Sequence, residues 1–191
     1  MLELHVCTQR EIARFYPLFE LDFDKKELPP RIAVHRAALR GDAELLSLRD
    51  SETGSDLGFA LVGCRGVYGY VWLKAFCVAP FLRGQGLGVE LMRLLNRRYA
   101  DRQGLVAELT AFGERAENSA QYKLRRFFRR FGYEEQPLAV TVGGAPASVF
   151  VKPLRGSAEL GASLRRVLLD FYGRFYSPAG IDETLGFPQE S

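Results

Sequence analysis

A glycine-rich loop between an apolar strand and an amphipathic helix is the segment best suited to chemistry. It follows the apolar run Val71–Val78 and precedes the helical pattern of Val89–Asp101. The loop consists of Arg83, Gly84, Gln85, Gly86, Leu87 and Gly88. A turn that opens a helix presents unpaired backbone N–H groups and the positive end of the helix dipole, which favour bound anions. Glycines let a ligand approach the backbone, and the Arg83 guanidinium can pair with a phosphate oxygen. We therefore predict that this loop binds a phosphate group.

Two common phosphate loops fit these residues less well. A Walker loop ends in Gly-Lys followed by Ser or Thr, which the sequence lacks here. A dinucleotide-binding loop has the spacing Gly-x-Gly-x-x-Gly, whereas this loop has Gly-x-Gly-x-Gly and places Val89 where the last glycine would stand. The spacing therefore disfavours both classes.

Glu108 is the carboxylate with the strongest claim to a chemical role. It lies in the predicted strand Leu105–Thr110, where the two-residue repeat of strand side chains places it on one face with Val106 and Thr110. A carboxylate on a central strand is costly unless it is paired or functional. Glu108 is either a base or substrate contact, or a structural salt bridge to Arg125 or Arg126. Both interpretations stay open.

The elements that must position these groups follow from the pattern of apolar residues. Alternating or continuous apolar residues predict strands, and a repeat of three to four residues predicts helices. Strands are expected at 2–8, 43–48, 58–64, 71–78, 105–110, 139–142 and 148–152, and helices at 9–20, 30–40, 89–101 and 118–131. From residue 156 we expect one more helix and then a tail rich in proline and glycine. This order predicts an α/β fold in which helices pack on a mixed sheet.

Composition limits the class of protein. The chain has 191 residues, 47% hydrophobic and 26% charged, which is typical of one globular domain with or without an appendage. A net charge of +3 is too small to bind nucleic acid by total charge, so an anion site must be local. The three cysteines form no Cys-x-x-Cys pair, so we expect reduced thiols and no metal. Because no apolar run approaches the about 18 residues of a membrane span and no signal-peptide pattern is present, we expect a cytoplasmic protein.

The segment Phe76–Gly88 resembles the acetyl-CoA motif of the GNAT acetyltransferases, Val-x-Pro-x-x-Arg/Gln-Gly-x-Gly-x-Gly/Ala. The resemblance implies the GNAT-like acyl-CoA transferase fold, a mixed and mostly antiparallel central sheet flanked by helices. That domain would span residues 1–154, and residues 155–191 would form a C-terminal helical extension. Leu124–Phe128 is also similar to a segment of a sparsely characterised bacterial subgroup of the family.

The resemblance assigns the cosubstrate, acetyl-CoA, to particular residues. Backbone groups of Phe76, Cys77 and Val78 would bind the pantetheine arm, and the amides of residues 83–88 would bind the pyrophosphate. In the family, an Asn precedes a catalytic tyrosine by seven residues, and here Gln121 stands at that position. Asn118, one turn earlier, is a candidate cofactor contact or the cap of the helix.

The family's acid, which protonates the departing CoA thiolate, does not carry over. It is a tyrosine in the pattern Tyr-x-x-x-Gly-Phe/Tyr, and Phe128 stands in its place before Gly132 and Tyr133. A phenyl ring donates no proton. Tyr122 lies six residues earlier on another face of the helix and is a weak substitute.

The resemblance implies an N-acetyltransferase that acts by direct attack in a ternary complex. The acceptor would be a primary amine of a small molecule or peptide, and acids between the first two helices would form its wall or simply a solvated loop: Glu20, Asp22, Asp24 and Glu27. The alternative is a catalytically impaired CoA-binding sensor or interaction module, because Phe128 replaces the tyrosine. We expect neither nucleic acid nor a membrane as partner, and the sequence leaves a homodimer open.

Overall fold

The structure, a computed structural model, describes residues 1–110, 120–157 and 159–188. Its strands are β1 Leu2–Val6, β2 Ala43–Asp50, β3 Asp56–Gly63, β4 Tyr70–Val78, β5 Gly104–Thr110, β6 Glu134–Glu135, β7 Val140–Val142, β8 Ala145–Pro153 and β9 Leu185–Gly186. Its α-helices are α1 Gln9–Phe19, α2 Arg31–Leu39, α3 Leu87–Arg98, α4 Ala120–Arg130, α5 Ser163–Gly173 and α6 Pro178–Thr184.

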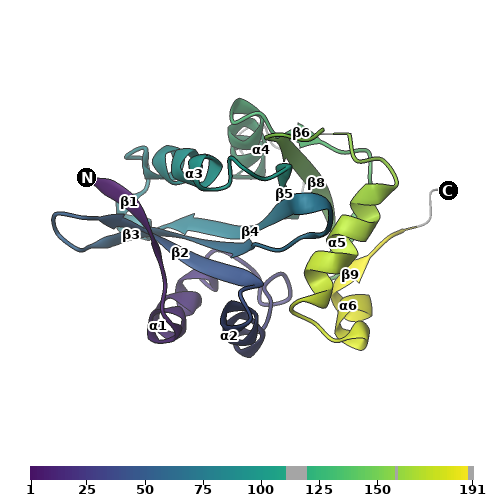
Figure 1. The fold of residues 1–191 in the computed structure, drawn as a ribbon, viewed down its shortest axis with the longest axis horizontal. Coiled ribbons are helices and arrows are strands. Elements are labelled where there is room, and N and C mark those ends of the chain that lie inside the picture. The colour runs from purple at the N-terminus through teal and green to yellow at the C-terminus, as the bar shows by residue number, and fades with distance from the viewer. Residues whose placement is uncertain (111–119, 158, 189–191) are drawn as a thin grey trace.

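The strands form one sheet in the order β1-β2-β3-β4-β5-β8-β7-β9, and β6 pairs with β8. The pairing of β4 with β5 is parallel, and the other neighbours are antiparallel. Helices α1 and α2 lie on one face of the sheet, and α3 and α4 lie on the other (Figure 1). The expected α/β architecture, a mixed and mostly antiparallel sheet flanked by helices, is confirmed.

Helices α1 and α3 show how local sequence fixes the layers. Thr8 caps α1, and Glu11 completes a reciprocal capping box with it. Ile12, Phe15 and Phe19 then point from one stripe of α1 into the core. On the opposite face of the sheet, α3 buries a stripe of its own: Leu91, Met92 and Leu95. Two hydrophobic layers therefore enclose the central strands.

The centre of the sheet opens where β4 and β5 separate. The two strands pair only from Tyr70 with Gly104 to Leu73 with Ala107, although β4 continues to Val78. At the same position the register between β3 and β4 shifts, so that Lys74 is an extra residue in β4. Such a bulge bends a strand and redirects a side chain. The chain thus places a charged side chain at the start of the gap.

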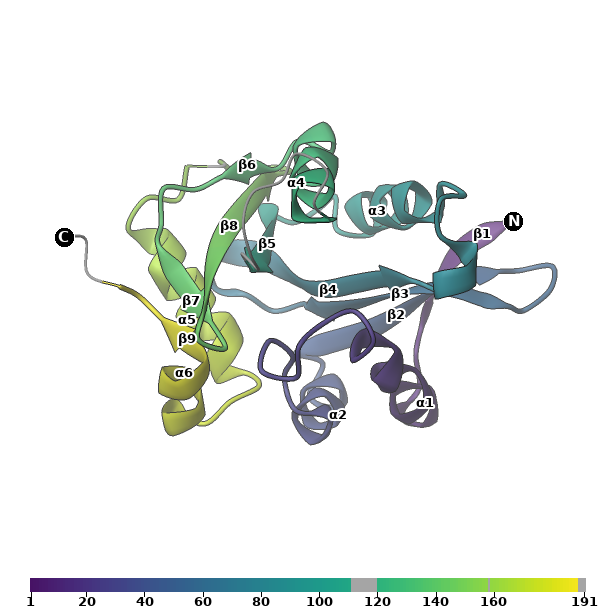
Figure 2. The ribbon, with the colours of Figure 1, turned by 180° about the vertical axis from the view of Figure 1, so that it is seen from behind.

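The C-terminal segment is more ordered than expected. The predicted proline- and glycine-rich tail contains α6 and β9, because Ser177 caps a helix that has Pro178 at its first position. β9 pairs with β7. Figure 2 shows this segment beside the β7–β8 hairpin, at the opposite end of the molecule from the N-terminus.

Helix α5 joins the hydrophobic core of the sheet. Its Phe171 and Tyr172 rings lie 5.6 and 4.9 Å from the Trp72 ring on β4. Val167 and Leu168 are fully buried in the same cluster. Helix α5 therefore belongs to the same hydrophobic cluster as α1 and α2 and covers Trp72 of β4.

The first strand departs from its expected pattern. Alternation predicts that Val6 is buried with Leu2 and Leu4, but Val6 is 44% exposed, and the strand ends there rather than at Thr8. β1 is an edge strand, and the chain leaves the sheet after Val6 so that Thr8 can cap α1. Helix capping thus ends the strand early.

Candidate functional site

A cavity of about 560 Å³ lies where β4 and β5 separate. Both strands, α4, β7 and the segment between α1 and α2 supply its walls. The lining residues are Asp22, Phe23, Glu27, Leu73, Lys74, Ala75, Phe76, Cys77, Val78, Arg83, Glu108, Leu109, Thr110, Leu124, Phe128 and Val142. The predicted pantetheine contacts (Phe76, Cys77 and Val78) and Glu108 therefore face one space.

The glycine loop beside this cavity has open backbone. Gly84 and Gly86 both have φ near +80°, and a Cβ atom added to either would meet no atom within 4 Å. Gly86 also caps α3, so the helix begins inside the loop. Among the described residues, no backbone carbonyl accepts the N–H groups of residues 84–88. The loop geometry therefore suits a bound anion.

A side chain that waits for a phosphate would extend freely from the loop. The Arg83 side chain is instead bound to protein groups. Its Nη2 atom lies 2.7 and 2.6 Å from the two carboxylate oxygens of Asp22, and its Nε atom donates to the carbonyl of Val78 at 3.2 Å. Half of the Arg83 side chain remains exposed. The guanidinium therefore ties the glycine loop to the segment between α1 and α2.

Glu108 forms a buried ion pair with Lys74. The Lys74 Nζ atom donates to Glu108 Oε2 at 3.0 Å, and the two side chains are only 4% and 3% exposed. The Tyr172 hydroxyl donates to the same oxygen at 2.9 Å. Burial raises the pKa of Tyr172, and the neighbouring Glu108 carboxylate raises this pKa further. Tyr172 is therefore a neutral hydrogen-bond donor at physiological pH.

The expected salt bridge between Glu108 and the arginines of α4 is wrong. Arg125 instead donates to Glu135 at 2.6 Å and to Ser148 at 2.8 Å. The bulge in β4 instead accompanies a Lys74 side chain that lies within hydrogen-bond distance of Glu108. Lys74 was detectable in the sequence as the one charged residue of an apolar strand, whereas Tyr172 carried no local signal.

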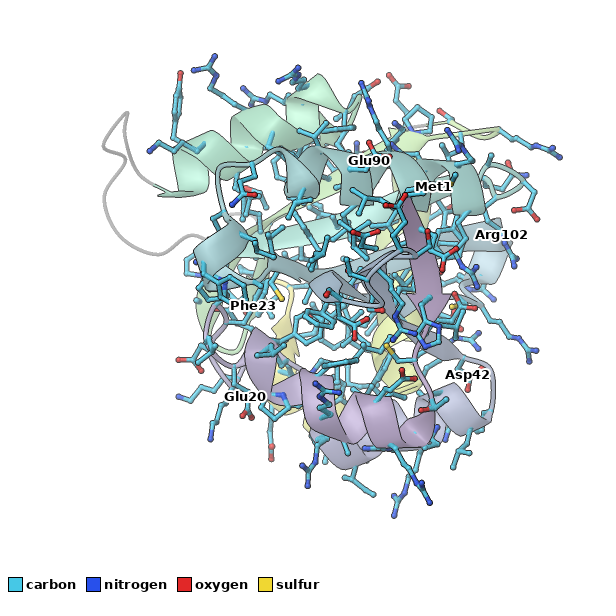
Figure 3. All side chains as sticks on the ribbon, turned by 90° about the vertical axis from the view of Figure 1, so that its left-hand side faces the viewer. Met1, Glu20, Phe23, Asp42, Glu90 and Arg102 are labelled. Atoms are coloured by element: carbon cyan, nitrogen blue, oxygen red, sulfur yellow. The ribbon has the colours of Figure 1, made fainter. Side chains whose placement is uncertain are left out.

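Glu27 is a second buried carboxylate in the cavity wall. It is 7% exposed, whereas Glu20 and Asp24 from the same segment are exposed. Burial raises the pKa of Glu27, and a hydrogen bond from Thr110 partly offsets this rise. Figure 3 shows Glu20 at the outer end of α1 and Phe23 nearer the sheet. Of the predicted acceptor-wall acids, Asp22 and Glu27 therefore line the cavity.

Two carboxylate oxygens in this wall have no hydrogen-bond partner among the described residues. They are Oε1 of Glu27 and Oε1 of Glu108, and both atoms are inaccessible to solvent. Glu27 is linked through Thr110 to the strand face that carries Glu108. A buried acceptor without a donor is unfavourable. The pair is therefore suited to a ligand that brings N–H groups.

The remaining predicted residues occupy different surroundings. Phe128 is 3% exposed and packs against Phe150 and Tyr133, with ring centroids 5.6 and 4.9 Å away. Tyr122 is 44% exposed, lies under the Arg126 guanidinium, and is outside the set of described residues that line the cavity. Asn118 falls outside the described residues. Phe128 contributes to the cavity wall.

No described helix has the length and apolarity that a membrane span requires. Within the described ranges, no three His, Cys, Asp or Glu side chains gather as a metal site would require.

Comparison with solved structures places this architecture in a known group. One similar structure is the ribosomal-protein-S18-alanine N-acetyltransferase from Escherichia coli. It has a TM-score of 0.58 and 16% identity, over 83% of this chain and 97% of that chain. A protein from Bacteroides thetaiotaomicron assigned to the GNAT family has a TM-score of 0.64 and 14% identity, over 86% of this chain and 93% of that chain. The structure of AAC(6')-Ib with paromomycin and acetyl-CoA has a TM-score of 0.58 and 15% identity, over 80% and 93%. At these identities the likeness concerns the fold.

Sequence comparison identifies the domain that holds the cavity. No curated protein matches the chain. Residues 43–135, from β2 to β6, match the family model of the acetyltransferase (GNAT) domain. This range includes the glycine loop, the gap between β4 and β5, and Glu108. The chain therefore contains a GNAT acetyltransferase domain.

Proposed function

We propose that this acetyltransferase transfers the acetyl group of acetyl-CoA to a primary amine by direct attack in a ternary complex. One observation carries the proposal: Arg83, the first residue of the open glycine loop, and the buried pair Lys74 and Glu108 line the same cavity, at the gap between β4 and β5. The loop supplies a site for the cosubstrate, and the cluster supplies a base. A thiol-release assay with acetyl-CoA and a broad panel of amines, peptides and antibiotics tests it.

The residues around the gap fit acetyl-CoA. The N–H groups of residues 84–88 would receive the pyrophosphate, since among the described residues no backbone carbonyl occupies them. The β5-facing edge of Phe76–Val78, which lies beyond the last β4–β5 pair, would receive the pantetheine arm. The thioester would then reach the part of the cavity that Lys74 and Glu108 line.

Glu108 has the position and the environment of a general base. Lys74 and Tyr172 both hold its Oε2 atom, while Oε1 is left without a partner among the described residues. The carboxylate would take one proton from the substrate ammonium at Oε1. The freed amine nitrogen would then attack the thioester carbon, and the C–S bond would break. The thiolate would leave with the electron pair and take the second proton from the nitrogen, which gives the neutral amide and the CoA thiol.

Direct attack is favoured over an acetyl-cysteine intermediate. Cys77 is the thiol that lines the cavity, and burial raises its pKa to about 12. The thiolate is the nucleophilic form of cysteine, so a thiol with this pKa is a poor nucleophile at neutral pH. The amine itself is therefore the better attacking group.

We expect Phe128→Tyr to leave turnover at least as high as in the wild type. The new hydroxyl would restore a proton donor at the position where the family has its acid, and the ring would keep most of the aromatic packing. Steady-state thiol release and thermal unfolding would both be measured, with Phe128→Leu as the packing control. A large fall in turnover for a tyrosine variant that folds normally would show that apolar packing is what this position requires.

We expect Asp22→Asn to tighten acetyl-CoA binding about two- to fivefold, the range of an exposed ion pair. The substitution releases the Arg83 guanidinium toward the phosphates and removes a negative charge beside them. Calorimetric titration with acetyl-CoA measures the change. Asp24→Asn is the matched control, because Asp24 is exposed and accepts a hydrogen bond from the Lys26 backbone. Weaker binding in Asp22→Asn would show that the Arg83 pair instead shapes the loop for the cosubstrate.

The alternative is a CoA-binding module without transferase activity, which the absence of a tyrosine at position 128 supports. Saturable binding of acetyl-CoA with no thiol release for any amine on the panel would favour this alternative.

A further inference from the structure

We propose that the acceptor is a primary amine with a single positive charge on an apolar body, and that its ammonium group binds between Glu27 and Glu108. This inference rests on the proposed function and assigns the class of its second substrate. It follows from the charges, the unpartnered atoms and the walls of the cavity.

The net charge of the buried side chains favours the binding of one cation. Glu27, Glu108 and Lys74 line the cavity. Glu27 is 7% exposed, and the side chains of Lys74 and Glu108 are 4% and 3% exposed. With both carboxylates ionised, this trio carries a net charge of −1. Asp22 and Arg83, the other charged residues of the lining, are paired with each other. One further positive charge therefore neutralises the cavity.

The unpartnered atoms have the chemistry that an ammonium group needs. Oε1 of Glu27 and Oε1 of Glu108 accept no hydrogen bond from any described residue. A primary ammonium carries three N–H donors, which is enough for one hydrogen bond to each oxygen. Glu108 would then be in position to take one of these protons. Glu27 would keep the substrate oriented as a binding residue.

The other walls of the cavity determine which chemical group the amine can be attached to. Phe23, Leu124 and Phe128 contribute apolar side chains to the cavity, and Val142 on β7 contributes another. The backbone at Gly143 comes so close to Lys26 that a Cβ added there would lie 2.8 Å from the Lys26 side chain, so β7 closes against the segment that carries Glu27. An aryl or alkyl group would bury apolar surface here.

More polar amines fit this wall poorly. A peptide or an aminoglycoside would place amide or hydroxyl groups against apolar side chains, where these groups lose water without gaining partners. A polyamine would bring a second cation to a cavity that one cation already neutralises. The structure therefore favours one class among the amines that the proposed function allows.

The test uses 2-phenylethylamine as the probe, with spermidine and an alanyl peptide amide as competing acceptors and 2-phenylethanol as the uncharged analogue. We expect kcat/KM for 2-phenylethylamine to exceed that for spermidine and for the peptide by about tenfold or more, the range of one well-filled apolar contact. Calorimetry on the protein with CoA should show that 2-phenylethylamine binds more tightly than 2-phenylethanol. Equal or better turnover of spermidine or the peptide overturns the inference and leaves the proposed function standing.

Glu27→Gln isolates the ammonium site. The variant keeps the shape of the side chain and leaves Lys74 paired with Glu108, so folding should be preserved. We expect KM for 2-phenylethylamine to rise about tenfold or more for loss of a charged hydrogen bond, while affinity for CoA and for 2-phenylethanol stays unchanged. Glu3→Gln on the exposed face of β1 is the matched control. An unchanged KM in Glu27→Gln would overturn the assignment.

Failure of the proposed function gives a different result. Absence of acetyl-CoA binding, or absence of thiol release with every amine, would reject the transferase activity itself. The calorimetric experiment still tests the ammonium site in that case, because it requires no turnover. No binding of 2-phenylethylamine by the folded protein with CoA would overturn the site independently.

Discussion

Glu108→Gln is expected to lower kcat by about 10² or more, because general base catalysis contributes roughly that factor, and to leave the affinity for acetyl-CoA nearly unchanged. The amide keeps the size of the side chain but has no basic oxygen to accept the substrate proton. A single-turnover measurement of thiol release at saturating acetyl-CoA isolates the chemical step.

The ion pair with Lys74 complicates this variant and also provides its control. Removing one partner of a buried pair leaves an uncompensated charge and costs about 3–5 kcal/mol of stability. Lys74→Met combined with Glu108→Gln removes both charges, and we expect this double variant to regain thermal stability but not turnover. Near-normal chemistry in the single or the double variant would exclude Glu108 as the base and leave a structural role.

Gly86→Val is expected to weaken acetyl-CoA binding about 100-fold or more. The added side chain would extend into the open space beside the loop, where the phosphates would lie, since no atom of the protein lies within 4 Å of a Cβ at this position. Several hydrogen bonds from backbone amides to a charged group would be lost, at about 1.5–3 kcal/mol each. Calorimetric titration of CoA measures the affinity.

Gly54→Val provides a control matched in backbone strain. Gly54 lies in the turn between β2 and β3, has φ of +69° against +80° for Gly86, and likewise has open space around a new Cβ. A side chain at either position is strained, at about 1–2 kcal/mol. Both variants should therefore lose similar stability, and only Gly86→Val should lose affinity. Wild-type affinity for CoA in a folded Gly86→Val protein would contradict the assignment of the loop.

The parts of this molecule that the sequence predicts are those with a local cause. The glycine loop is recognised from consecutive residues, and the strand and helix around it follow from apolar repeats. The position of Glu108 within a strand is also local. These features required no knowledge of what packs against them.

The partners of Glu108 depend on contacts between distant segments. Lys74 reaches the carboxylate because β4 has one extra residue against β3, and a bulge of this kind is not encoded by an apolar repeat. Tyr172 belongs to a helix whose presence is predictable but whose docking site is not. α6 was missed for another reason: Pro178 and Gly180 suggested a tail, although Ser177 followed by Pro178 is a helix start.

The docking of α5 gives the protein an intrinsic optical reporter. Trp72 is the single tryptophan of the chain, and it contacts Phe171, Tyr172 and the Lys74 ammonium, which lies 4.8 Å from its ring. Lys74 and Tyr172 are 98 residues apart, and contacts of such separation form slowly because a long loop must close first. Fluorescence of Trp72 during refolding therefore follows the step that completes the Glu108 cluster, separately from the formation of the hairpins.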